Sequence, residues 1–176
     1  RFTVAQSVRE PIAIHFDGDQ AERLIQAMER AGLTPVENYL NRYPHQLSGG
    51  QLQRIAIARA IALEPRFLVA DEPVSMLDVS IRAGILNLLR YFAEALQMAI
   101  LYISHDLSTM RHVCSQVAIM YLGRIVEIGP AQDVLRDPQH PYARALMAAV
   151  PLMGGQKRKR IHLSGAVPNP IDLPTG

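Results

Sequence analysis

Cysteine and tryptophan are nearly missing from this 176-residue sequence, which has one cysteine, Cys114, and no tryptophan. A single cysteine excludes an intramolecular disulfide and is typical of a protein from a reducing compartment. Neither sign of charge dominates, because 18 Lys and Arg residues face 16 Asp and Glu residues. The net charge of +2 does not by itself indicate a nucleic-acid or membrane-surface partner.

Long hydrophobic runs are missing as well. The longest, residues 145–153, includes Pro151 and has about half of the ~20 residues that a membrane-spanning helix needs. The first residues, Arg1 to Val4, include neither an initiator methionine nor the apolar stretch of a signal peptide, so we interpret the chain as beginning inside a longer protein. The apolar share of 49% and the charged share of 19% are typical of a globular chain of about one domain.

Hydrophobic spacing and capping residues predict alternating helices and short strands. Helices are expected over residues 19–31, 34–41, 50–63, 131–136 and 142–150, and after Asp78 and His105, with Thr34, Ser48 and Asp78 as N-caps. Strands are expected over residues 67–70, 98–104, 116–121 and 124–128, the last two joined by a turn at 122–123. The first two are continuously apolar and should be covered on both faces, which favours an α/β fold with a parallel sheet. An extended, Pro-rich tail should follow Pro151.

The segment Leu47–Arg54 places a hydroxyl, Ser48, and two glycines at the start of a predicted helix. Backbone N–H groups and the positive end of the helix dipole make such a start an anion site, and glycine lets a phosphate approach the backbone. Taken alone, the same residues also fit an ordinary N-cap after a loop.

Acidic residues and a histidine follow the two buried strands. Asp71 and Glu72 end the first strand, and His105 comes just after the second. Because ligands gather at the carboxyl ends of parallel strands, these three side chains can converge at one edge of the sheet. Phosphoryl-transfer enzymes present one carboxylate to Mg²⁺ and another to water in this way. Each residue alone would also fit a solvated strand end or a structural histidine.

The order of these segments resembles the ATP-binding cassette (ABC) ATPase family. Leu47–Gln51 is similar to the family signature, Phe67–Glu72 to its Walker B strand, Ser75–Asp78 to its D-loop and His105 to its switch histidine. Four further segments resemble the subfamily that energises oligopeptide, dipeptide and nickel importers: residues 42–46, 120–127, 138–142 and 168–171.

This resemblance implies the C-terminal part of a P-loop NTPase domain. A helical subdomain with the signature would span 1–63, half of the parallel-sheet core would span 64–130, and a C-terminal extension would span 131–176. The chain would then be part of an ABC-type transport ATPase, which couples ATP hydrolysis to the uptake of oligopeptides or dipeptides.

The resemblance also implies a role for each motif residue. Asp71 would hold Mg²⁺ through water, Glu72 would polarise the attacking water, and His105 would contact the γ-phosphate of ATP. The residues that grip ATP bound mainly to a partner subunit would be Ser48, Gly49, Gly50 and Gln51. Ser75 and Asp78 of the D-loop would organise the same dimer interface.

The implied partners are a second ABC ATPase subunit, identical or related, and two transmembrane permease subunits. A periplasmic or extracellular binding protein would act indirectly, and no nucleic acid is expected. The subunit would lie at the cytoplasmic face of the cell membrane as a peripheral protein.

The sequence departs from the family pattern in three ways. It contains no G-x-x-x-x-G-K-[ST] phosphate loop, and its only lysines are Lys157 and Lys159. The family's Q-loop glutamine and the aromatic residue that stacks on adenine would lie upstream of Arg1, and Gln6 does not have the Q-loop context. Met76 stands where a small residue is usual, and Gln46 where an acid is common. Since the phosphates would lose most of their donors without the loop, we expect the isolated chain neither to bind MgATP tightly nor to hydrolyse it.

Other interpretations of the same motifs are a non-catalytic ABC-like dimerisation module, a non-transport ABC protein, and the ATPase of a nickel or oligosaccharide importer. The basic run Lys157–Arg160 is interpreted as a solvated charge run. Cys114 is expected to be buried in the helix after His105. The methionines expected to fill apolar cores are Met98, Met110, Met120, Met147 and Met153.

Overall fold

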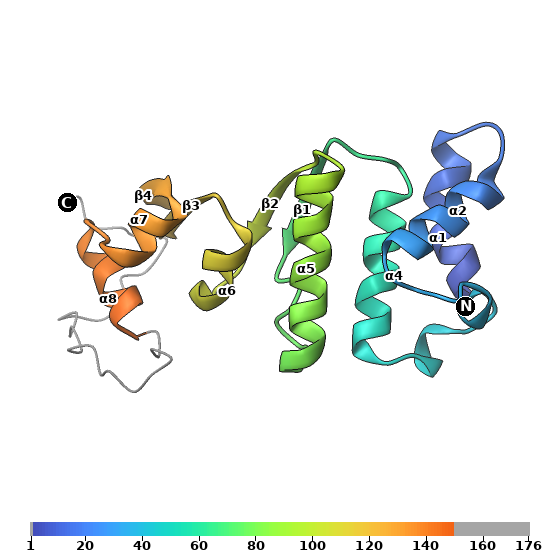
Figure 1. Ribbon diagram of the computed structural model, residues 1–176, viewed down its shortest axis with the longest axis horizontal. Helices are drawn as coiled ribbons and strands as arrows, with labels where there is room; N and C mark the ends of the chain where they lie inside the picture. Colours follow the sequence, from blue (N-terminus) through green and yellow to red (C-terminus); the bar gives the residue numbers. More distant parts are fainter. Residues whose placement is uncertain (1, 150–176) are drawn as a thin grey trace. The chain divides into compact units, whose positions relative to one another are not determined.

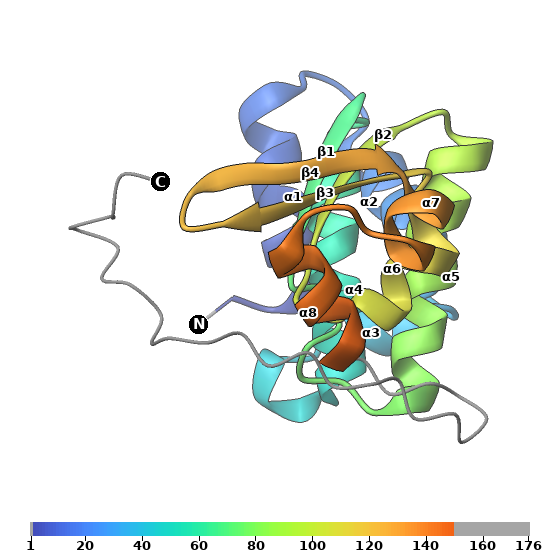
Figure 2. The same ribbon diagram turned by 90° about the vertical axis from the view of Figure 1, so that its left-hand side faces the viewer.

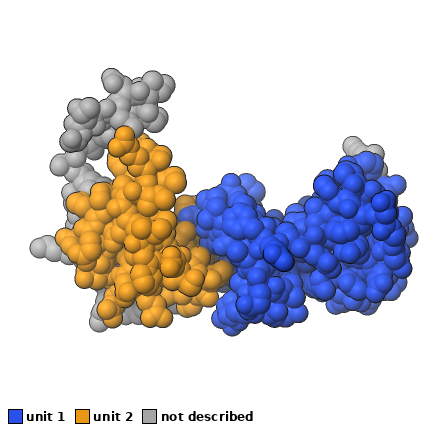
Figure 3. Space-filling model, turned by 90° about the horizontal axis from the view of Figure 1, so that it is seen from above, with its two compact units in different colours: residues 1–104 blue, residues 105–176 orange. Residues whose placement is uncertain are grey.

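The computed structural model describes residues 2–149 of the chain. The chain divides into two compact units, Arg1–Ser104 and His105–Gly176 (Figure 3). The predicted Pro-rich tail, the basic run Lys157–Arg160 and Met153 lie outside the described residues.

The first unit begins with helices that pack around the helix carrying the Ser-Gly-Gly segment. That helix, α4 (Gly49–Ile61), contacts α1 (Val4–His15) and α2 (Gln20–Arg30) on one side and α5 (Val79–Ala95) on the other (Figure 1). Apolar side chains at helical spacing are fully buried between them, including Val8, Ile12, Met28 and Ala58. The predicted cap Ser48 accepts a hydrogen bond from the first turn of α4, and Asp19, at the start of the expected range 19–31, caps α2 in the same way.

Two elements near the start of the chain differ from the prediction. The helix expected over 34–41 is a single turn, α3 (Glu37–Leu40), followed by the 3₁₀ turn η1 (Pro44–Gln46). Val36, not Thr34, occupies the N-cap position of α3, and it has no side-chain acceptor to stabilise a longer helix. Helix α1 was not specifically predicted, although Thr3 and Gln6 form a capping box at its start.

Two parallel strands, β1 (Phe67–Asp71) and β2 (Ala99–Ile103), form the sheet of the first unit. Their register pairs Phe67 with Ala99 and Asp71 with Ile103, so the carboxyl ends of both strands lie side by side. Helix α5 connects the strands and contacts β2. Its inward positions, Ile85, Leu89 and Phe92, are at most 1% exposed.

The prediction that both faces of these strands are covered is wrong for the described residues. Ala70 and Tyr102 are buried, but the opposite face is exposed. The exposed fractions on that face are 56% for Phe67, 52% for Val69, 48% for Leu101 and 43% for Ile103. A continuous apolar run shows that each residue type tolerates burial, whereas the number of covering layers depends on the packing of other elements.

The second unit is built on a long hairpin of β3 (Gln116–Tyr121) and β4 (Arg124–Pro130) (Figure 2). The predicted turn is present, with Leu122 and Gly123 at φ of 48° and 76°, the left-handed pair that tight hairpins favour. The helices of this unit are α6 (Leu107–Val113), α7 (Ala131–Arg136) and α8 (Pro141–Ala149). The expected helices over 131–136 and 142–150 are therefore confirmed within the described residues.

Two expectations about burial need correction. Met98, Met110 and Met147 are buried as predicted, but Met120 is 61% exposed because β3 alternates and its inward positions are Val117 and Ile119. Cys114 follows α6 as its C-cap and is half-buried. No helix within residues 2–149 combines the length and the apolar character that crossing a bilayer requires.

Candidate functional site

The start of α4 is closed by a reciprocal capping box. Ser48 Oγ accepts a hydrogen bond from the Gln51 N–H at 3.3 Å, and Gln51 Oε1 accepts one from the Ser48 N–H at 3.0 Å. Helix geometry gives the N–H groups of Gly49 and Gly50, in the first turn, no acceptor inside the helix. Gly49 is exposed and Gly50 is buried. The positive end of α4 therefore reaches the surface at Ser48 and Gly49, where it favours an anion.

The two glycines have different neighbours. A Cβ on Gly50 would lie 2.5 Å from Ile81 Cγ2 of α5, whereas a Cβ on Gly49 would lie 3.7 Å from Leu77 Cδ2. The absence of a side chain at Gly50 is thus required by packing against α5. These contacts place the start of α4 directly beside the turn formed by residues 75–78.

Hydrogen bonds to the neighbouring backbone fold this turn. Ser75 Oγ donates to the Glu72 carbonyl at 3.1 Å, and Arg82 Nη2 donates back to the Leu77 carbonyl at 3.4 Å. Asp78 occupies the N-cap position of α5, but its side chain makes no capping hydrogen bond, contrary to the prediction. Asp78 is exposed instead.

The acidic pair lies where β1 ends. The Glu72 N–H donates to the Ile103 carbonyl at 2.9 Å, which extends the pairing of the two strands by one residue. Glu72 has φ of 45°, a left-handed conformation that is uncommon outside glycine and clusters at functional sites. Asp71 is exposed and Glu72 is half-buried, so the strand end presents a carboxylate to solvent next to a strained turn.

His105 follows β2 by two residues, is exposed, and begins the second unit. The convergence of His105 with Asp71 and Glu72 therefore stays a prediction. Asp106, the next residue, caps α6 by accepting a hydrogen bond from the Ser108 N–H at 3.1 Å. Within residues 2–149, no group of three or more His, Cys, Asp or Glu side chains is arranged to hold a metal ion.

Sequence comparison connects these features to a known family. Residues 1–75 match the ABC transporter family, and residues 126–176 match the C-terminal region of oligopeptide/dipeptide transporters. The chain belongs to the ABC transporter family. A protein of Brucella ovis, named as a candidate peptide import ATP-binding protein, is 47% identical over 180 residues, which cover 100% of this chain and 56% of that protein.

A second relative is the oligopeptide transport ATP-binding protein OppF of Escherichia coli. It is 43% identical over 183 residues, which cover 100% of this chain and 54% of OppF. The chain thus spans little more than half the length of these curated relatives.

A solved structure supports the fold. The dimeric ATP-binding cassette MJ0796 bound to ADP and Pi is 28% identical and has a TM-score of 0.65. The match covers 74% of this chain and 57% of that cassette. The α/β arrangement described above is therefore part of an ABC ATPase fold, as expected from the sequence.

Arg54 of α4, to which the sequence analysis gave no role, connects α4 to a neighbouring helix. Arg54 ends the predicted anion-binding segment, and its Nη1 donates to the Ala31 carbonyl at the end of α2 at 2.7 Å. The sequence does indicate this position through its spacing, because Arg54 follows Gly50 by one helical turn and therefore lies on the same face of α4.

Proposed function

We propose that the chain is part of the ATP-hydrolysing subunit of an importer for oligopeptides or dipeptides. The observation that carries this proposal is the contact between the start of α4 and the turn 75–78, made through Gly49, Gly50, Leu77 and Ile81. It brings together the segment 47–51 and the turn 75–78, which are 24 positions apart at their nearest ends, beside an acidic strand end. The peptide-transport names of the relatives favour this substrate class.

In this proposal the start of α4 binds the γ-phosphate of an ATP held mainly by a partner subunit. The dipole of α4 and the Gly49 N–H point at the same exposed place, and a phosphate there would gain both. The hydroxyl of Ser48 and the amide of Gln51 can exchange their mutual hydrogen bonds for bonds to phosphate oxygens. The Gly50 N–H would add a donor from the same turn, and the exposed Ser75 and Asp78 would contact the partner subunit.

The acidic strand end suits Mg²⁺, because that ion binds one or two carboxylates together with waters and phosphate oxygens. Asp71, exposed at the end of β1, would hold the ion, which when bound would neutralise charge on the transferring phosphate. Glu72 would accept a proton from the attacking water. The left-handed backbone conformation of Glu72 fixes the point from which its side chain leaves the strand end. His105 would donate to the γ-phosphate.

The assembly that follows has two ATPase subunits and two transmembrane permease subunits. ATP would be enclosed between the signature segment of one subunit and the phosphate loop of the other, so that hydrolysis depends on dimer closure. The subunit would act at the cytoplasmic face of the membrane. A substrate-binding protein would select the peptide.

A chimera tests the proposal. The chain replaces the 183 matched residues of E. coli OppF, and oligopeptide uptake and ATP hydrolysis are measured in the assembled transporter. We expect uptake with the unaltered chain and a loss of about 100-fold or more in hydrolysis for Glu72→Gln, since general-base catalysis contributes on this order. Glu94→Gln, an exposed position on α5, is the matched control and should keep full activity.

An inactive chimera that is folded and assembled would refute the proposed function. Undiminished turnover of Glu72→Gln would refute the role of that carboxylate. Isothermal calorimetry on the isolated 176-residue chain should detect no micromolar binding of MgATP.

A further inference from the structure

The guanidinium of Arg54 lies close to two glycines, one in the turn after α2 and one in α5. A Cβ on Gly32, just after α2, would lie 2.5 Å from its Nη1, and a Cβ on Gly84 of α5 would lie 3.1 Å from its Nη2. Nη1 also donates to the Ala31 carbonyl. One side chain of α4 therefore touches the end of α2 and the middle of α5 at the same time.

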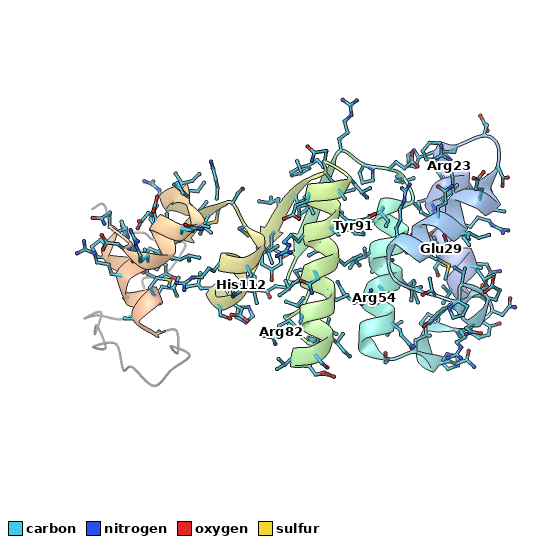
Figure 4. All side chains as sticks on the ribbon, in the orientation of Figure 1. Arg23, Glu29, Arg54, Arg82, Tyr91 and His112 are labelled. Carbon is cyan, nitrogen blue, oxygen red and sulfur yellow. The ribbon has the colours of Figure 1, made fainter. Side chains whose placement is uncertain are left out.

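The contact continues the packing of the Ser-Gly-Gly segment. Gly50 and Arg54 are four residues apart on one face of α4, and Ile81 and Gly84 are three apart on one face of α5, so both pairs face each other as neighbouring rows. Gly50 receives Ile81, and Gly84 receives Arg54. Figure 4 labels Arg54 on α4, next to α5.

Charge and shape both favour arginine at this place. The last carbonyls of α2 carry partial negative charge and lack partners within the helix, so a cation is stabilised there. The guanidinium is planar, with donors on both Nη atoms in a rigid fork. A lysine ammonium could bind the Ala31 carbonyl but would leave the space beside Gly84 empty.

We propose that Arg54 is a positioning residue, which fixes the spacing between the start of α4 and the turn 75–78 that precedes α5. The inference rests on the proposed function, in which these two segments engage one nucleotide and one partner subunit together. Arg54 itself touches neither. A change at Arg54 would let α4 shift against α5, so the signature segment would meet the γ-phosphate out of alignment while ATP remained bound to the other subunit.

Two variants alter this contact from opposite sides. Arg54→Lys removes the planar fork, and Gly84→Ala leaves Arg54 unchanged but presses on its Nη2. The matched control is Arg59→Lys, in the same helix, whose ion pair with Glu10 is at the surface. In the OppF chimera, we expect Arg54→Lys to lower kcat by about ten-fold or more and to change the KM for ATP by less than about two-fold, because misalignment costs reactivity and spares ground-state binding. Gly84→Ala should lower kcat in the same direction by a smaller factor, because the end of the arginine side chain needs to move only a few tenths of an ångström.

Spin labels measure the spacing directly in the 176-residue chain. With Cys114→Ser, labels at Ala56→Cys on α4 and Ala83→Cys on α5 occupy exposed positions. Arg54→Lys and Gly84→Ala should broaden and displace the distance distribution between the labels, and Arg59→Lys should not. If Arg54 only adds stability, Arg54→Lys and Gly84→Ala would lower the melting temperature and leave the distance between the labels unchanged.

The outcomes separate this inference from the proposed function. If the unaltered chimera is inactive, the proposed function fails, and the label distances still decide whether Arg54 fixes the spacing. If the chimera is active and Arg54→Lys and Gly84→Ala keep both wild-type kcat and wild-type distances, the inference is overturned. The inference is also overturned if these two variants lower the melting temperature but change neither kcat nor the distance between the labels.

Discussion

The contact between Gly50 and Ile81 makes a quantitative prediction about stability. In Gly50→Ala the new Cβ would lie 2.5 Å from Ile81 Cγ2 and 3.2 Å from Cδ1, against the ~3.5–4.0 Å at which two carbon atoms attract each other. Either α4 or Ile81 must therefore move by about an ångström. In Gly49→Ala the nearest atom is Leu77 Cδ2 at 3.7 Å, an ordinary contact.

The two glycines form a matched pair, since they are consecutive and both lie in the first turn of α4. Replacement by alanine gains up to about 1 kcal/mol of helix propensity at either position. Overpacking a buried contact costs about 1–3 kcal/mol and applies to Gly50 alone. The difference between the two variants thus isolates the clash, and we expect Gly50→Ala to be less stable than Gly49→Ala by about 1–3 kcal/mol.

Thermal unfolding followed by far-ultraviolet circular dichroism measures this difference. For a chain of this length it corresponds to a melting temperature lower by about 2–12 °C in Gly50→Ala, at ~2–4 °C per kcal/mol. In an Ile81→Ala background the difference should disappear, because both clashing carbons are removed. Equal stability of the two single variants, or a difference that survives in the Ile81→Ala background, would refute the assignment of Gly50 to helix packing.

Two further predictions concern the second unit. Glu127 accepts the N–H groups of Gln139 and His140, each at 2.9 Å, so Glu127→Ala should lower the local stability before α8 by about 1–3 kcal/mol. Hydrogen exchange of these two amides should accelerate, with a smaller effect in Glu127→Gln, which keeps one acceptor; unchanged exchange would contradict the role of the carboxylate. Burial raises the pKa of the Cys114 thiol, which lowers its thiolate fraction at a given pH. The pH–rate profile of alkylation by iodoacetamide should therefore have its midpoint at higher pH in the folded chain than in urea, and coincident midpoints would contradict this.

Elements whose boundaries depend on local chemistry could be predicted from the sequence. Ser48 caps α4 as predicted, and the hairpin turn at 122–123 has the backbone that its glycine permits. Asp19 and Asp106 cap α2 and α6, and their side chains suit that position although the prediction assigned neither as a cap. Each of these features is decided by a few neighbouring residues. Thr34 and Asp78 are the exceptions. Val36 takes the N-cap position of α3 in place of Thr34, and Asp78 occupies the N-cap position of α5 without the expected hydrogen bond.

Features that depend on packing between distant segments could not be predicted in this way. The apolar strand residues Val69 and Leu101 suit burial on both faces, yet about half of each side chain is exposed. Met120 is as apolar as Met110, but alternation along β3 turns it outward. The type of a residue indicates whether its side chain tolerates burial, but only the arrangement of the neighbouring elements decides whether that side chain is buried.

The Ser-Gly-Gly segment combines both kinds of information in four residues. The capping box of Ser48 and Gln51 and the exposed first residue of the helix, Gly49, are local features, and they are what favours an anion site. The glycine at position 50 answers a tertiary demand, because Ile81, 31 positions along the chain, occupies the place of its side chain. A motif interpreted only as a phosphate cradle would assign both glycines to the ligand. In the structure Gly49 is exposed at the helix end, whereas the absent side chain of Gly50 makes room for Ile81 of α5, so the same short segment both presents the helix end and fixes it beside the turn 75–78.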